Sequence, residues 1–470
     1  MISFTVGLVA LILGYILYGA VIERVFGPDD QRKTPCYTKQ DGADYIPLSA
    51  WRVFLIQFLN IAGTGPIFGA VMGILFGPAA YLWIVFGCIF AGAVHDYMSG
   101  MISLRKGGAS LPEVMGDELG NGVRLLMRIF SLVLLVLLGA VFVTTPADLL
   151  AQMTQGWSWS NSAVWCGIIF VYYILATILP IDTVIARVYP LFGLALLIMA
   201  LGVGAAIYLH DGFMPELTDP LTGNHPRGLA LFPMLCITIA CGAISGFHGT
   251  QSPLMARCMT NERLGRRIFY GTMITEGIVA LIWAGAAIKF AGSYQALGEM
   301  GTPAVVVNKI CSGWLGSVGA ILAVLGVVAA PITSGDTAFR SARLIAADFL
   351  HMKQNTILRR LSLSLPLFVV AVALLFIDFN VLWRYFAWVN QTLAMITLWS
   401  ITVWLCRHDK CFWVALLPAM FMTVLSISYI IVAPEGFLQP LSWGIGCGLA
   451  VMVLFTVLFF RSKGTKLKND

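Results

Sequence analysis

Residues 60–69 read NIAGTGPIFG and residues 242–253 read GAISGFHGTQSP, and each stretch lies inside a long apolar run. Glycine and proline lower the cost of interrupting a helix, and an interrupted helix exposes N–H and C=O groups that lipid cannot satisfy. Such a break must face protein, an ion or a wet cavity. Ordinary kinks at close helix contacts are the alternative, but two such stretches in corresponding positions favour a functional pair.

The rest of the chain has the composition of a multi-pass membrane protein. Of its 470 residues, 59% are hydrophobic and only 11% are charged, whereas soluble domains carry about 25% charged residues. This excludes a soluble enzyme, a nucleic-acid-binding protein and a secreted disulfide scaffold. The ten cysteines form no C-x-x-C pair, so neither a metal site nor a disulfide framework is expected.

Apolar runs bounded by polar residues, glycine or proline predict about 13 membrane spans. They lie near residues 3–22, 50–76, 79–102, 122–146, 161–180, 187–209, 229–257, 268–290, 313–333, 361–377, 381–405, 412–432 and 441–460. Lysine and arginine concentrate in the loops on one side, and the other side keeps only Arg227, Lys289, Lys309 and Arg384. Because cytoplasmic loops carry the excess of basic residues, the N-terminus is predicted outside and the C-terminus inside.

The spacing of the two glycine-rich spans predicts an inverted repeat. The second glycine-rich span starts five spans after the start of the first. Because five is odd, the two cross the membrane in opposite directions, and paired broken helices of this kind mark the binding site of a transporter. We expect an all-α integral membrane protein with two five-helix repeats, at residues 50–209 and 229–405. A peripheral helix at residues 1–22 would precede them, and two peripheral helices with a basic tail, at 412–470, would follow.

Four motifs resemble those of the carbon starvation protein A family. They are residues 61–67 (IAGTGPI), 92–97 (GAVHDY), 242–248 (GAISGFH) and 333–343 (TSGDTAFRSAR). The resemblance runs from about residue 50 to 350 and implies an uptake system of the bacterial inner membrane, associated with peptides or pyruvate. It also implies the leucine-transporter type of five-plus-five inverted repeat found in the amino acid-polyamine-organocation superfamily.

The two breaks predict the substrate site. The N-terminus of a half-helix presents free N–H groups and a partial positive charge, which suits a carboxylate. The breaks contain no acidic residue for an ammonium group, which mildly favours a small monocarboxylate over a peptide. The residues expected to line the site are Gly63, Thr64, Gly65, Ser245, Gly246, Phe247, His248 and Gln251.

The resemblance implies a cation site as well. The superfamily's sodium site uses an Ala-x-x-Thr-Ser arrangement, here Ala330, Thr333 and Ser334, with two carbonyls of the first broken helix, near Leu59 and Ala62. The alternative is that the two hydroxyls bond back to the preceding helical turn. Other superfamily members use protons, so Na⁺ and H⁺ both stay open, and no further metal or cofactor is expected.

Ionisable residues inside a membrane are costly and are functional candidates. His95, Asp96 and Glu276 are therefore candidates for proton coupling. The alternatives are a structural His95–Asp96 pair, and a Glu276 carboxylate paired with an arginine of an inner loop.

A last charged group follows the cation-site motif. Asp336, Arg340 and Arg343 share a face at helical spacing, with Asp336 and Arg340 four residues apart. We expect them to form an inner gate or a structural network.

The leading function is secondary active import of a small carboxylate or a short peptide by alternating access, driven by a cation gradient. No phosphate-binding G-x-x-x-x-G-K-[ST] motif is present for a built-in ATPase. The alternatives are a membrane enzyme that uses His95 and Asp96, a channel, and a nutrient sensor, although no signalling domain is evident. The expected partners are the substrate and lipid.

Overall fold

The computed structural model describes residues 1–154, 156–178, 185–377 and 379–466, and no strand occurs among them. The helices are α1 (Ile2–Leu13), η1 (Gly14–Tyr18), α2 (Gly19–Phe26), α3 (Pro35–Thr38), α4 (Ala50–Ile61), α5 (Thr64–Gly73), η2 (Ile74–Phe76), α6 (Ala79–Leu82), η3 (Trp83–Gly92), α7 (Ala93–Arg105), α8 (Leu111–Leu119), α9 (Asn121–Met153), α10 (Ser162–Ile178), α11 (Ile185–Leu209), α12 (Met234–Thr238), α13 (Gly246–Ala256), η4 (Glu262–Leu264), η5 (Arg266–Tyr270), α14 (Gly271–Ala291), α15 (Tyr294–Glu299), α16 (Pro303–Ala323), η6 (Val324–Ala329), α17 (Ala330–Phe349), α18 (Ile357–Leu374), α19 (Phe379–Arg407), α20 (Trp413–Val432) and α21 (Leu441–Lys466).

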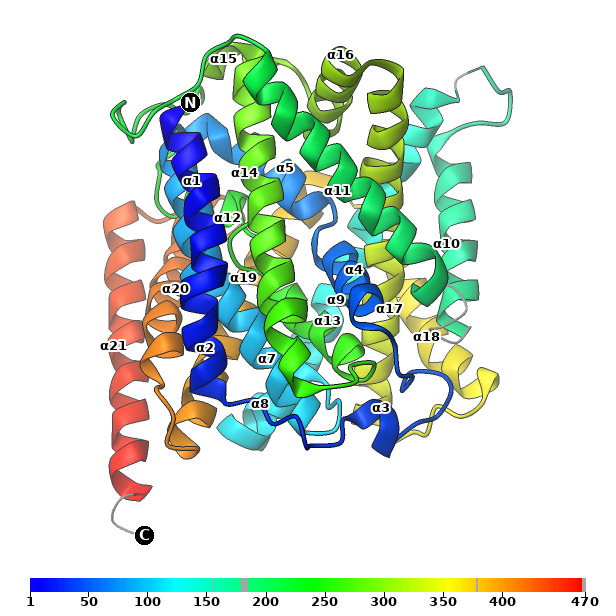
Figure 1. Cartoon of the computed structure of the whole chain (residues 1–470), viewed down its shortest axis with the longest axis vertical. Coiled ribbons are helices and arrows are strands. Elements are labelled where there is room, and N and C mark those ends of the chain that lie inside the picture. The colour runs from blue at the N-terminus through cyan, green and yellow to red at the C-terminus, as the bar shows by residue number, and fades with distance from the viewer. Residues whose placement is uncertain (155, 179–184, 378, 467–470) are drawn as a thin grey trace.

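The described residues contain nine helices that are long and apolar enough to cross a membrane. A bent pair, Ala50–Ile61 with Thr64–Phe76, makes a tenth if it counts as one span. The start of α1 and the end of α21 lie at opposite ends of the long axis (Figure 1), which agrees with the odd number of crossings predicted from the sequence. The all-helical membrane fold is thus confirmed, while the count of 13 spans and the orientation in the membrane stay predictions.

Both glycine-rich spans are interrupted. Helix α4 ends at Ile61 and α5 begins at Thr64, with a bend of 47° between them. Helix α12 ends at Thr238 and α13 begins at Gly246, and residues 239–245 between them are not helical. In Figure 1, α4 to α5 runs toward the end that holds the N-terminus, whereas α12 to α13 runs the opposite way. The breaks therefore have the opposed directions that the sequence predicted.

The two broken helices also pack against each other. A Cβ atom on Gly69 of α5 would lie 2.7 Å from the carbonyl oxygen of Thr238 at the end of α12. Since that neighbour is backbone and cannot rotate away, only glycine permits this approach. The same small residues that weaken each helix thus also bring the two breaks together.

The helices differ in how much of their surface is covered. The most apolar window of the η4–α14 span is 89% buried, whereas that of α21 is 17% buried. Helix α14 therefore belongs to the centre of the bundle, while α21 lies at its edge and presents apolar side chains outward (Figure 1). This arrangement brings any polar group on α14 into the protein interior.

Helix α17 extends beyond residue 333, where the predicted ninth span ends. It continues without a break from Ala330 to Phe349, which agrees with the helical spacing expected for Asp336, Arg340 and Arg343. The apolar run stops because the later turns carry Asp336, Arg340 and Arg343, and all three are buried against neighbouring helices. Hydropathy marks contact with lipid, so it misses a helix whose polar turns lie inside the bundle.

Candidate functional site

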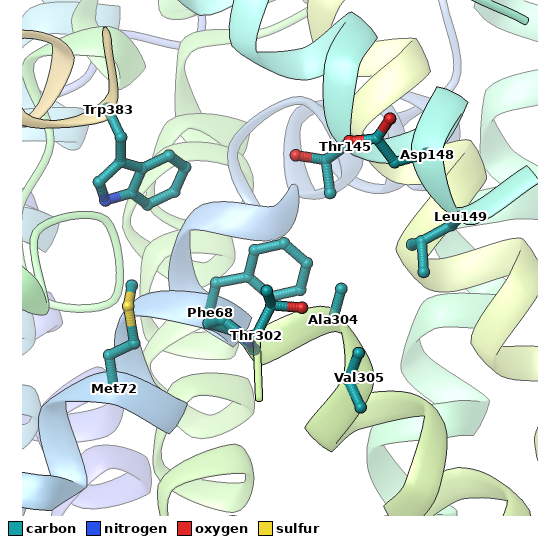
Figure 2. Close-up of a pocket in the computed structure, with 10 residues that line it drawn as sticks. Phe68, Met72, Thr145, Asp148, Leu149, Thr302, Ala304, Val305 and Trp383 are labelled. Carbon is teal, nitrogen blue, oxygen red and sulfur yellow. The ribbon is translucent and has the colours of Figure 1, made fainter. Parts of the chain in front are cut away.

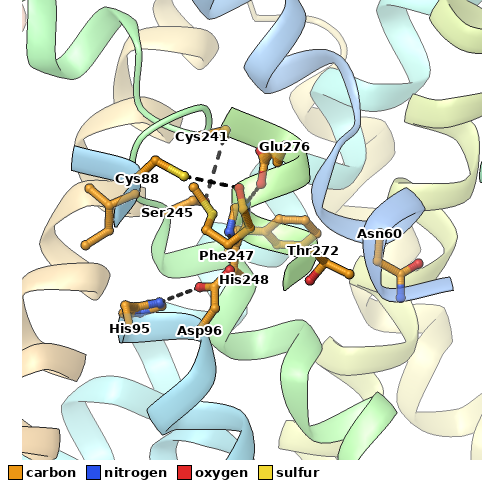
Figure 3. A network of polar contacts seen from close by, with 12 residues as sticks. Asn60, Cys88, His95, Asp96, Cys241, Ser245, Phe247, His248, Thr272 and Glu276 are labelled. Atoms are coloured by element: carbon orange, nitrogen blue, oxygen red, sulfur yellow. Dashed lines mark hydrogen bonds and ion pairs between the residues drawn. The ribbon is translucent and has the colours of Figure 1, made fainter. Parts of the chain in front are cut away.

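Four buried ionisable side chains from three helices form one continuous chain, here called the central network (Figure 3). Nδ1 of His95 lies 2.7 Å from Oδ1 of Asp96, and the other oxygen of Asp96 lies 2.9 Å from Nδ1 of His248. Nε2 of His248 lies 3.5 Å from a carboxyl oxygen of Glu276. All four residues have an exposed fraction of 0%. The network joins α7, the second half-helix α13 and the central helix α14.

Local packing positions this network. His95 and Asp96 lie in the first turn of α7, which continues from the π-helical segment η3. The His95 ring packs against Gly249 of α13, where a Cβ atom would lie 3.2 Å from its Cε1 atom. Glycine at that position leaves room for the ring beside α13, so the histidine from α7 and the histidine from α13 reach the same carboxylate.

The network leaves several polar atoms unsatisfied. Among the described residues, Nε2 of His95, Nε2 of His248 and both carboxyl oxygens of Glu276 have no hydrogen-bond partner. A buried ionised carboxylate costs several kcal/mol unless it is paired and hydrogen-bonded. Imidazole is the side chain that exchanges a proton most readily near neutral pH. Two carboxyl groups that share two imidazoles can therefore store a proton and pass it along the chain.

The sequence analysis identified these residues but divided them between two sites. His95, Asp96 and Glu276 were expected as proton-coupling candidates, and His248 was expected to line the substrate site. The structure brings all four together, and Glu276 contacts His248 where an inner-loop arginine was the alternative partner. Their roles in transport stay predictions.

An asparagine from a later helix holds the second break. Oδ1 of Asn390, on α19, accepts hydrogen bonds from the Ser245 hydroxyl at 3.0 Å and from the Phe247 N–H at 2.8 Å. It thereby caps the first turn of α13. The next residue, Gln391, donates a hydrogen bond to the Ile244 carbonyl at 3.0 Å. The sequence analysis missed both residues, although an Asn-Gln pair inside an apolar span is a usable signal.

The eight residues predicted to line the substrate site are buried and closely packed in this conformation. A Cβ atom on Gly63 would lie 3.0 Å from the Ser334 hydroxyl, and one on Gly65 would lie 2.6 Å from the Cys241 sulfur. Gln251 donates to the Ser341 hydroxyl at 3.2 Å. The remaining five, Thr64, Ser245, Gly246, Phe247 and His248, are buried. The breaks are thus packed shut, and this substrate site stays a prediction.

Two polar side chains beside the first break were also missed. Gln57 and Asn60 lie three residues apart on α4, are fully buried and have no hydrogen-bond partner for their amide atoms in the described part of the chain. Figure 3 draws Asn60 on α4, on the other side of α13's first turn from His95 and Asp96. Unsatisfied buried amides of this kind mark a place where a ligand or water can bind.

The predicted cation site is partly assembled. The Ser334 hydroxyl of α17 lies 3.3 Å from the Leu59 carbonyl oxygen and 3.2 Å from that of Asn60. These carbonyls belong to the last turn of α4, where a helix leaves them without intrahelical partners. Thr333 donates instead to the Ala330 carbonyl at 2.8 Å, which is the back-bonded alternative.

The carbonyls next to Ser334 are therefore those of Leu59, which was predicted, and of Asn60, where the prediction was Ala62. Neutral oxygens from a hydroxyl and from carbonyls suit a hard cation. Occupancy by Na⁺ stays a prediction.

A second group of charged residues lies toward the end of the bundle whose loops carry most of the lysines and arginines. It is here called the inner cluster and consists of Asp44, Arg340 and Arg343. Oδ1 of Asp44 lies 3.2 Å from the Arg340 guanidinium and 3.5 Å from that of Arg343. All three residues are buried. Burial alone would raise the pKa of the Asp44 carboxyl, but the guanidinium groups of Arg343 and Arg340 lower this pKa to about 2.

The acidic residue that pairs with the two arginines is Asp44, whereas the sequence predicted Asp336. Asp336 accepts a hydrogen bond from the Tyr189 hydroxyl of α11, while Asp44 from the loop before α4 contacts both arginines. Asp41 holds that loop in place, because its carboxylate accepts hydrogen bonds from the N–H groups of residues 43–45. Residues in an irregular loop follow no helical periodicity, so the position of Asp44 beside the two arginines could not be predicted from the sequence.

Comparisons with known proteins agree on family and fold. The model of the family described as carbon starvation protein CstA matches residues 1–164 and 152–312. An uncharacterized membrane protein of Haemophilus influenzae is 44% identical over 352 residues, which cover 64% of this chain and 94% of that protein.

Two relatives of Escherichia coli carry functional names. The peptide transporter CstA is 26% identical, with 89% of this chain and 78% of that protein covered. The pyruvate/proton symporter BtsT is 31% identical, and the match spans 60% of this chain but only 48% of that protein.

Among solved structures, MhsT in complex with L-phenylalanine superposes with a TM-score of 0.56 at 14% identity, and the match covers 89% of this chain and 99% of MhsT. At this identity the likeness concerns the fold alone. It supports the predicted leucine-transporter type of architecture.

Proposed function

The chain belongs to the carbon starvation protein CstA family, and we propose that it imports a small carboxylate or a short peptide by coupling uptake to protons. Family membership identifies it as a multi-pass transporter of the bacterial inner membrane and not an enzyme, since the named relatives are transporters. The substrate and the coupling ion are the proposed part.

The central network carries the proposal of proton coupling. It places two carboxyl groups and two imidazoles in one buried chain, and it connects α7 and α14 to the half-helix α13. Protonation of Asp96 would weaken its contacts with the two histidines because it removes the negative charge, whereas protonation of a histidine would strengthen its contact with the Asp96 carboxylate. A proton could therefore change how α13 is held, which is the half-helix that borders the second break. The name of the E. coli symporter BtsT supports the same ion.

Two observations support the substrate class. The first turns of α5 and α13 both begin at breaks inside the bundle, where half-helix N-termini favour a carboxylate. The names of the relatives include both peptides and pyruvate, and each of these compounds carries a carboxylate. Because the breaks are packed shut, substrate entry requires the half-helices to separate, as alternating access demands.

Sodium coupling is the second candidate, and the position of Ser334 favours it. Its hydroxyl lies against two carbonyls of the first broken helix, so a cation there would tie α17 to α4. Linkage requires that substrate then tightens ion binding by the same factor as the ion tightens substrate binding. In that case Thr333→Val with Ser334→Ala abolishes accumulation and leaves the fold intact.

Purified protein in proteoliposomes separates the two ions. We expect an inward proton gradient to drive uptake of radiolabelled pyruvate or dialanine above equilibrium, and an inward Na⁺ gradient at equal pH to have no effect. Uptake that follows Na⁺ and ignores the pH gradient would reject proton coupling. Absence of accelerated exchange from the opposite side would reject the carrier mechanism itself.

A further inference from the structure

A cavity of about 350 Å³ lies on the side of the breaks toward the N-terminal end of the long axis, and it is here called the outer vestibule. Four segments line it: α5, the end of α9, the start of α16 and the start of α19 (Figure 2). Its volume is within the range of about 300–1,000 Å³ typical of ligand sites. The lining residues are Phe68, Met72, Thr145, Asp148, Leu149, Thr302, Pro303, Ala304, Val305 and Trp383.

The outer vestibule leads toward both breaks. Phe68 lies one helical turn after Thr64, where α5 begins at the first break. Trp383 lies two turns before Asn390, the residue that caps the second break. With the predicted N-out orientation, the cavity faces the outside and is the approach to the substrate site.

The side chains that line the outer vestibule favour a positively charged group on the ligand. Among the described residues that line the cavity, Asp148 is the only charged one. The Ser162 hydroxyl donates to one of its carboxylate oxygens, which orients the group. In Figure 2, the Trp383 ring lies across from Asp148, with Phe68 between them. A carboxylate with two aromatic rings favours an ammonium group through charge and cation–π attraction, and it disfavours a lone carboxylate.

We propose that the outer vestibule binds the ammonium group of the substrate through Asp148, so that the chain selects a short peptide over a monocarboxylate that has no amine. This inference rests on the proposed transport function and specifies its substrate. The ammonium group faces Asp148, and the carboxylate of the same molecule points toward the half-helix N-termini at the breaks. The absence of an acid at the breaks then no longer argues against a peptide, because the acid lies in the vestibule.

The test compares three compounds in proteoliposomes under an imposed pH gradient: dialanine, N-acetyl-dialanine and pyruvate. For the wild type, we expect dialanine uptake to be about threefold to fivefold more efficient than that of the other two, because Asp148 is exposed and an exposed charge pair contributes modestly. Asp148→Asn should raise the KM for dialanine by about the same factor and leave kcat unchanged. Asp211→Asn is the matched control, because Asp211 is an exposed acid after α11 that does not line the vestibule.

Each outcome decides between the claims. Equal uptake of dialanine and its N-acetyl derivative, or pyruvate uptake that exceeds both and is unaffected by Asp148→Asn, overturns the inference and leaves the proposed function intact. If the wild type accumulates none of the three compounds, the proposed function fails instead. Thermal stabilisation in detergent then tests the vestibule directly: dialanine that stabilises the wild type but not Asp148→Asn supports the inference, and equal or absent stabilisation overturns it.

Discussion

The central network and the inner cluster are both buried groups of charged residues, yet they are built from different chemistry. The central network joins two carboxyl groups to two imidazoles, and imidazole is the type of side chain that most often serves as a proton carrier in proteins. The inner cluster joins one carboxylate to guanidinium groups that stay charged. The first group can therefore change its charge during a transport cycle, whereas the second can only separate or stay together. We therefore propose proton exchange for the central network and a latch for the inner cluster.

The largest expected effect is on the central network. Glu276→Gln removes the carboxyl group that ends the chain, so it should reduce pH-driven accumulation by at least about 100-fold, the range that general acid–base groups contribute. Counterflow exchange, which needs no net proton transfer, should persist. Glu299→Gln is the control, since Glu299 is exposed on α15. Concentrative uptake by Glu276→Gln under a pH gradient would contradict the role given to the network.

The next effect is on stability and concerns the inner cluster. Asp44→Ala leaves two buried arginines without their carboxylate, which should cost about 3–5 kcal/mol in the free energy of unfolding. Asp30→Ala breaks the exposed pair with Arg263 and should cost less than about 1 kcal/mol.

Thermal unfolding in detergent measures both changes. Labelling of the buried thiol Cys258, which contacts the Asp44 carbonyl, reports opening of the latch. Equal melting temperatures for Asp44→Ala and Asp30→Ala would show that the inner cluster is not a latch.

The two groups should also respond to different pH ranges. The pKa of Asp44 is lowered from 3.8 to about 2, so its ionised form stabilises the folded state above pH 4, and this contribution is lost as the pH falls toward 2. The contribution is about 2 kcal/mol at neutral pH.

The difference in melting temperature between wild type and Asp44→Asn should be constant from pH 8 to pH 5 and shrink below pH 4. Transport, in contrast, should change between pH 5 and pH 8, where imidazoles titrate. If the melting-temperature difference changes between pH 5 and pH 8, the inner cluster responds to the same pH range as transport, and the distinction between the two groups is wrong.

The smallest expected effect tests whether the position of the His95 ring in the central network matters for transport. In Gly249→Ala, the new Cβ atom would lie 3.0 Å from Cδ2 of Leu111 and 3.2 Å from Cε1 of His95, so the leucine side chain and the imidazole ring must each shift by a few tenths of an ångström. Because proton transfer depends on alignment, we expect a few-fold slower pH-driven uptake with little change in melting temperature. Counterflow at the wild-type rate serves as the internal control. A large loss of stability would mean that Gly249 matters for packing and not for the position of His95.

The sequence predicted the parts of the fold that depend on local chemistry. Glycine-rich sequence indicated both breaks, although the second one, at residues 239–245, overlaps only the start of the stretch 242–253, because Pro253 lies inside α13. The last turns of α17 lie beyond the predicted span, since their polar residues are buried by other helices and hydropathy cannot register that. The central network was not predicted as a unit, because its members lie on α7, α13 and α14 and meet only through tertiary packing. Asp44 and Asn390 were missed for the same reason.

Infrared difference spectroscopy of the detergent-purified protein, titrated from pH 8 to pH 5, tests the central claim most directly, because it detects protonation without requiring a known substrate. The account predicts carboxyl or imidazole protonation bands in the wild type that change or disappear in Glu276→Gln and in His248→Gln, and that are unchanged in Asp44→Asn. Identical spectra for the wild type and the two network variants would contradict it, because the central network would then take up no proton in the range where transport operates.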